Sequence, residues 1–86
     1  MGYSLTDTLL QADMDALLDL GFACSTGAEG REIDLVSAHK WFNLAALAGS
    51  EEAQYCRTDI AVQMSRSEIA EAQRRARTWL EVRTAH

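Results

Sequence analysis

Apolar residues in this chain recur every three or four positions, which is the spacing of one face of an α-helix. The pattern first predicts a helix over residues 5–26, with an apolar face made of Leu10, Met14, Leu17, Gly21 and Cys24. Leu5 and Leu9 lie slightly off this face, so the segment is either one helix or a short lead helix followed by a longer one. Gly27 is expected to end it, because glycine readily adopts the left-handed conformation that closes many helices.

Three further helices are predicted, and each has a residue suited to begin it. Asp34 and Ser50 can accept hydrogen bonds from the free N–H groups of a first helical turn, and Ser65 with Glu68 has the spacing of a capping box. Their apolar faces consist of Leu35, Ala38, Trp41, Phe42, Leu44 and Ala45, of Ala53, Cys56, Ile60 and Met64, and of Ile69, Ala72, Ala76, Trp79 and Leu80. Because the loops are short and no segment alternates like a strand, the chain predicts an all-α fold of four antiparallel helices.

Composition and charge narrow the class of protein. With 86 residues, of which 48% are apolar and 24% charged, the chain is expected to form one domain over residues 1–86. Its acidic N-terminal segment does not resemble a secretory signal, and no apolar run approaches the roughly 20 residues that span a bilayer. A cytoplasmic location without membrane contact is therefore expected. The net charge is −5, and residues 1–34 carry seven acidic side chains and one basic one, which disfavours nucleic acid as a partner of this half.

Residues 16–49 resemble a known helical repeat. The similarity rests on Ala16, Leu20, Gly21, Gly27, Asp34, Ala38, Trp41, Phe42, Ala45, Ala46 and Gly49. This pattern is similar to the Sel-one-like repeat, a helix pair related to the tetratricopeptide repeat, although Cys24 replaces the usual tyrosine. Residues 50–82 would then form a degenerate second pair, whose last helix resembles the capping segment that follows such repeats in bacterial proteins. The resemblance implies an α–α superhelix that acts as a non-catalytic protein-interaction module or adaptor.

The resemblance also implies a binding surface, because in this family the first helix of each pair lines a groove for a peptide or a helix. Carried over to this chain, the groove positions are Asp15, Leu18, Phe22, Ser25, Tyr55, Asp59 and Val62. Leu18 and Phe22 lie off the apolar face of the first helix, so they either form an exposed apolar patch or are covered by Leu5, Leu9 or the last helix. The alternative function is a homo-oligomeric structural protein whose groove is filled by another copy.

Residues with reactive side chains do not form a recognisable catalytic, cofactor or metal site. Cys24 and Cys56 fall on apolar helix faces and are interpreted as small buried hydrophobic residues, with a redox or metal role as the alternative. Their spacing to His39 and His86 matches no zinc motif. We therefore expect no enzymatic activity, no cofactor and no bound metal.

Arg74, Arg75 and Arg77 gather in the second half of the last predicted helix. One interpretation is that these cations offset the dipole of that helix. The other is a patch for an anionic partner, namely an acidic peptide, nucleic acid or the acidic first helix of a neighbouring copy. A small nucleic-acid-associated regulator is accordingly the weaker alternative function.

Overall fold

The computed structural model describes residues 11–84. Within this range the chain forms helices and no strand, which confirms the predicted all-α class. The elements are α2 (Gln11–Thr26), the short 3₁₀ turn η1 (Ala28–Gly30), α3 (Leu35–Leu47), α4 (Glu51–Ala61) and α5 (Arg66–Thr84). The predicted lead segment with Leu5 and Leu9 lies outside the described residues.

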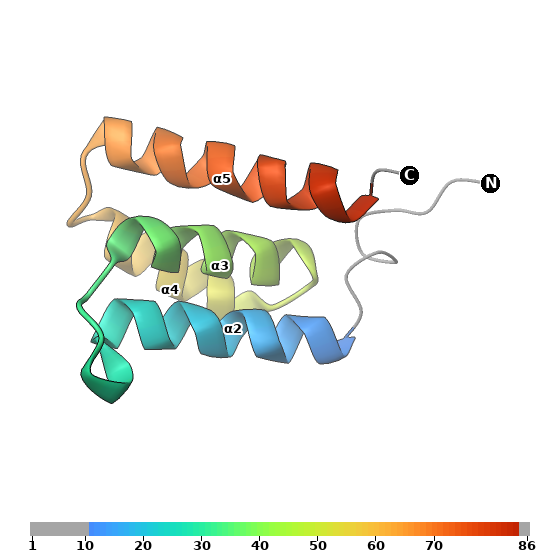
Figure 1. Ribbon diagram of the computed structural model, residues 1–86, viewed down its shortest axis with the longest axis horizontal. Coiled ribbons are helices and arrows are strands. Elements are labelled where there is room, and N and C mark those ends of the chain that lie inside the picture. Colours follow the sequence, from blue (N-terminus) through green and yellow to red (C-terminus); the bar gives the residue numbers. More distant parts are fainter. Residues whose placement is uncertain (1–10, 85–86) are drawn as a thin grey trace.

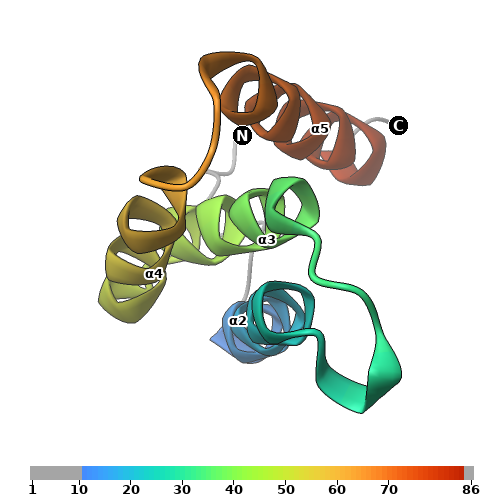
Figure 2. The ribbon, with the colours of Figure 1, turned by 90° about the vertical axis from the view of Figure 1, so that its left-hand side faces the viewer.

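Helix α3 is the centre of the fold. It packs against α2, α4 and α5, and Figure 1 shows α2 and α5 on opposite sides of it. The view in Figure 2 shows α4 on a third side. Four of its apolar side chains are almost fully buried, namely Ala38, Phe42, Leu44 and Ala45. The core is therefore built around one helix, and the other three helices each bury their apolar face against it.

Helix α5 packs chiefly against α3 rather than against its neighbour in sequence, α4. Ala72 and Ala76 are buried, and such small side chains let two helices approach closely. The Trp79 ring meets the Trp41 ring edge to face at a centroid distance of 6.1 Å. The two small side chains and the indole pair thus hold α5 on α3, and none of the helices within residues 11–84 covers the outer side of α4.

The predicted start signals all act as caps. The backbone N–H of Ser37 donates to Asp34 Oδ1 over 3.0 Å, and that of Ala53 donates to Ser50 Oγ over 3.0 Å. Ser65 and Glu68 cap each other, because the N–H of each donates to a side-chain oxygen of the other, at 2.8 and 3.1 Å. These contacts satisfy N–H groups that have no partner within their own helices.

Gly21 sets the distance between α2 and α3. A β-carbon at this position would lie 2.5 Å from Cδ1 and Cε1 of the Phe42 ring, which is closer than two non-bonded carbon atoms can approach. Phe42 is almost fully buried and also contacts Phe22, so its ring has little room to move away. The missing side chain of Gly21 is therefore what allows the Phe42 ring to lie against the α2 backbone.

We predict that Gly21→Ala lowers the free energy of unfolding. Overpacking of a core costs about 1–3 kcal/mol, and the better helix propensity of alanine offsets about 1 kcal/mol of this cost, which leaves a net loss of up to about 2 kcal/mol. Urea unfolding followed by circular dichroism measures this change. If the ring of Phe42 is the obstacle, Gly21→Ala should cost less in a Phe42→Leu background, and an equal cost in both backgrounds would contradict this explanation.

Candidate interaction surface

The predicted groove positions on α2 lie largely against the core. Leu18 and Phe22 are half-buried and pack on the central hydrophobic cluster. The Phe22 ring meets the Phe42 ring edge to face at a centroid distance of 5.4 Å. Leu18 and Phe22 are therefore partly covered, and for Phe22 part of the cover comes from Phe42 of α3. The predicted cover by Leu5 or Leu9 lies outside the described residues. Among the other two α2 positions, Asp15 is exposed and the Ser25 hydroxyl donates to the Phe22 carbonyl over 3.2 Å.

The predicted groove positions Tyr55 and Asp59 on α4, and Val62 at its C-cap, are all exposed to solvent. Tyr55 and Val62 have 79% and 84% of their surface accessible, the largest values for any large apolar side chain among residues 13–83. Each follows a buried residue of α4 by two positions: Tyr55 follows Ala53, and Val62 follows Ile60. Two positions are about 200° around a helix, so Tyr55 and Val62 point away from α3. The two halves of the predicted groove therefore differ in burial, because Leu18 and Phe22 are half-buried and Tyr55 and Val62 are exposed.

Carboxylates flank Tyr55 along the same exposed face. Glu51 and Asp59 lie four residues before and after Tyr55, which places each about one helical turn from the ring. A shallow open hollow of about 300 Å³ lies beside the ring, lined by Glu51, Gln54, Tyr55 and Thr58. The basic residue of α4 is Arg57, and its guanidinium donates to the side-chain oxygen of Asn43 on α3. The exposed face of α4 is thus apolar and acidic, without a basic side chain.

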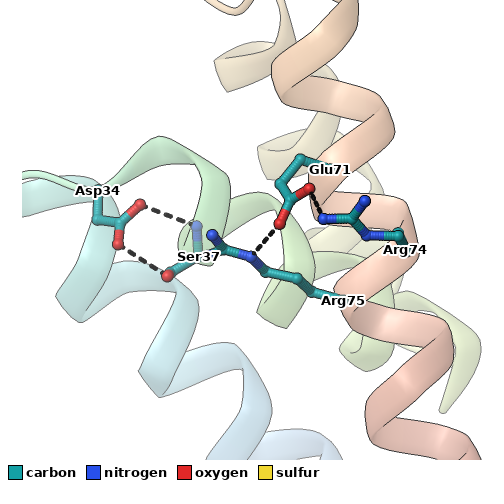
Figure 3. A network of polar contacts seen from close by, with 5 residues as sticks. All are labelled: Asp34, Ser37, Glu71, Arg74 and Arg75. Carbon is teal, nitrogen blue, oxygen red and sulfur yellow. Dashed lines mark hydrogen bonds and ion pairs between the residues drawn. The ribbon is translucent and has the colours of Figure 1, made fainter.

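The predicted arginine patch on α5 is partly neutralised by Glu71 of the same helix. Figure 3 shows Arg74 and Arg75 reaching the two carboxylate oxygens of Glu71, and the Arg75 contact is 2.7 Å long. Hydrogen bonds from Arg75 and then Arg74 hold the pKa of Glu71 below its ordinary value. Arg77 is exposed and makes no ion pair with the described residues. The three arginines therefore do not act as one free cationic patch.

Arg75 also lies near the beginning of α3. The pKa of Asp34 is lowered first by the hydrogen bond from the Ser37 backbone, and the Ser37 hydroxyl and the charge of Arg75 lower it further. Figure 3 shows the Arg75 side chain extending toward Asp34 and Ser37. The charge of this α5 arginine thus favours the ionised form of the carboxylate that caps a neighbouring helix, which the sequence pattern did not reveal.

The described aromatic side chains divide into contacted and uncontacted rings. Lys40 lies 3.8 Å from the centre of the Trp41 ring, and Arg83 lies 4.5 Å from that of Trp79. Arg83 also lies 3.7 Å from Asp13 of α2, a pairing that no sequence spacing indicates. Tyr55 differs, because within the described part of the chain it has neither a ring partner nor a cation over its face.

The reactive side chains are separated from one another. Cys24 and Cys56 are free and half-buried, and burial, followed by the charges of Glu52 and Asp59, raises the pKa of Cys56. Residues 11–84 contain no group of three His, Cys, Asp or Glu side chains placed to bind a metal ion. His86 lies outside the described residues. No helix in this range is both long enough and apolar enough to cross a membrane.

His39 is a titratable side chain that the structure buries and to which the sequence pattern assigns no role. It is 3% exposed, and its Nδ1 atom has no hydrogen-bond partner in the part of the chain that the structure describes. Burial lowers its pKa below the ordinary value of 6.5, and the nearby charge of Arg57 lowers it further. The neutral imidazole is therefore the form that the folded chain accommodates.

Comparison of the chain with protein-family models, curated proteins and solved structures finds no match. The resemblance to Sel-one-like repeats accordingly stays a prediction from the sequence.

We predict that His39 makes the fold less stable in mild acid. The unfolded chain takes up a proton near pH 6.5 and the folded chain only at lower pH, so the free energy of unfolding falls as the pH drops below about 6.5. For one proton the slope is at most about 1.4 kcal/mol per pH unit. Urea unfolding between pH 7.5 and 5.5 measures this loss of stability. This pH range lies above the one in which carboxylates such as Asp34 and Glu71 become protonated. His39→Leu should flatten the profile, and an unchanged slope would exclude His39 as its cause.

Proposed function

We propose that this chain is a non-catalytic protein-interaction module, and that the outward face of α4 is its binding surface. The observation that carries the proposal is the exposure of Tyr55 and Val62, at 79% and 84%. Exposed apolar side chains contribute little to the stability of a monomer, whereas burial of the same surface against a partner is favourable. Tyrosine is also among the residues that contribute most to binding at protein interfaces.

The support beneath this face is rigid. Ser50 is buried and caps α4, and Ala53 and Ile60 fix the helix to the core. A surface carried on a packed helix is presented in one geometry, which lowers the entropy cost of binding. The α4 positions Tyr55, Asp59 and Val62 are also those that the repeat resemblance assigns to a binding groove, whereas the α2 positions Leu18 and Phe22 contribute mainly to the core.

We predict that a photo-crosslinker at position 54 captures a partner protein in the host cell. Gln54 lies beside Tyr55 and is exposed, and Gln73 on α5 is an exposed glutamine on another helix that serves as the matched control. Replacement of Gln54 by p-benzoylphenylalanine should yield a specific adduct on irradiation, and replacement of Gln73 should not. Mass spectrometry then identifies the captured chain.

The same crosslinker separates binding from stability. Tyr55→Ala and Val62→Ser should each abolish the adduct formed from position 54 while changing the free energy of unfolding by no more than about 0.5 kcal/mol, as expected for exposed side chains. Equal adducts from positions 54 and 73, or adducts that persist in both variants, would refute the assignment of the interface to α4.

A further inference from the structure

We infer that the partner of α4 presents a basic segment, with an Arg or Lys side chain over the Tyr55 ring and an apolar side chain on Val62. This inference rests on the proposed function and adds the chemistry of the partner to it. The four residues that would make the contact are called the α4 stripe and are Glu51, Tyr55, Asp59 and Val62.

The first argument is the surroundings of the Tyr55 ring. Both described tryptophans carry a cation, since Lys40 lies over Trp41 and Arg83 over Trp79. The Tyr55 ring is mostly exposed and has no cation from the described residues over it. An aromatic face with a carboxylate one turn away on each side suits a guanidinium or ammonium group, because the ring attracts the cation and the carboxylates can accept its hydrogen bonds.

The second argument is that the acidic charge of this face is not compensated by the described residues. Glu51, Glu52 and Asp59 are exposed on α4 and form no ion pair with the described residues. Arg57 is turned toward Asn43 on the α3 side of the helix. A basic partner would supply the missing charge, and complementary charge of this kind also speeds association.

The third argument distinguishes a different basic protein from a second copy of this chain. Two copies would each carry a net charge of −5 and repel each other at long range. Of the exposed arginines that a second copy could offer, Arg74 and Arg75 pair with Glu71 and Arg83 pairs with Asp13, whereas Arg31, Arg66 and Arg77 form no ion pair with the described residues. The net charge is then the stronger of the two observations. Charge therefore favours a cationic chain other than this one.

The spacing of the α4 stripe sets the pattern that the partner must present. Tyr55 and Val62 are seven residues apart, which is two helical turns or about 10.5 Å along the axis. A helix with a basic residue and an apolar residue seven positions apart shows both on one face. A basic amphipathic helix is thus the form of partner that fits the α4 stripe.

We predict that a synthetic basic helix binds the α4 stripe. The probe is an end-capped, alanine-based peptide with two arginines four positions apart and a leucine seven positions after the first. The matched control peptide carries citrulline at both arginine positions, which keeps the shape and removes the charge. In a titration of the ¹⁵N-labelled full chain followed by NMR, the arginine peptide should shift the amide signals of residues 51–62. The citrulline peptide should bind at least roughly tenfold more weakly, which corresponds to 1.4 kcal/mol.

Charge variants of the chain test the same contact from the other side. Glu51→Gln together with Asp59→Asn should weaken binding of the arginine peptide at least roughly tenfold, as should Tyr55→Leu. Asp19→Asn together with Glu81→Gln removes two exposed acidic charges elsewhere and is the matched control. Because salt screens charges that lie far from the peptide, this double variant should leave the affinity within a factor of about two.

Each of the other possible outcomes would overturn the inference. Equal binding of both peptides at residues 51–62 would overturn the basic partner and keep α4 as an interface. Absence of shifts at these residues, or shifts confined to α2, would overturn the inference as well, and the crosslinks from position 54 would then decide the proposed function separately. Sedimentation that shows a stable dimer, lost in Val62→Ser, would identify the occupant as a second copy and would also overturn the inference.

Discussion

The close approach of the Phe42 ring to the α2 backbone at Gly21 is the contact on which the arrangement of helices depends. A side chain at position 21 would occupy the space of that ring. With the ring in place, Phe42 meets Phe22 as well, and the two contacts fix α2 along one side of α3. The remaining buried faces of α3 are then available to α4 and α5, so one small residue determines which surfaces the other helices can use.

The exposed face of α4 follows from this arrangement. Because α5 is held on α3 by its buried alanines and by the Trp41–Trp79 contact, it does not cover α4. Helix α4 is attached through Ala53 and Ile60, and its opposite side faces solvent. The exposure of Tyr55 and Val62 is therefore a consequence of how the central helix distributes its neighbours.

Local features of this fold could be read from the sequence, and long-range ones could not. The caps at Asp34, Ser50 and Ser65 depend on residues three positions apart, and the apolar faces depend on helical periodicity, so both were predictable. The placement of Phe22 depends on where the Phe42 ring of another helix lies, and the contact of Arg83 with Asp13 joins opposite ends of the chain. Periodicity within one helix contains no information on either. The same limit explains why the α2 and α4 halves of the predicted groove differ in burial.

The distribution of charge connects the fold to the proposed partner. The chain uses most of its described arginines internally: Arg74 and Arg75 on Glu71, Arg83 on Asp13 and Trp79, and Arg57 on Asn43. Each of these contacts gives a guanidinium group a partner within the chain, whereas Glu51, Glu52 and Asp59 on α4 form no ion pair with the described residues. The fold thereby leaves carboxylates that have no ion pair with the described residues beside its most exposed aromatic ring. A partner that buries this ring must also satisfy the neighbouring carboxylates, because an unpaired charge in an interface is costly. A basic side chain meets both requirements at once, and an apolar or acidic partner meets only one or neither.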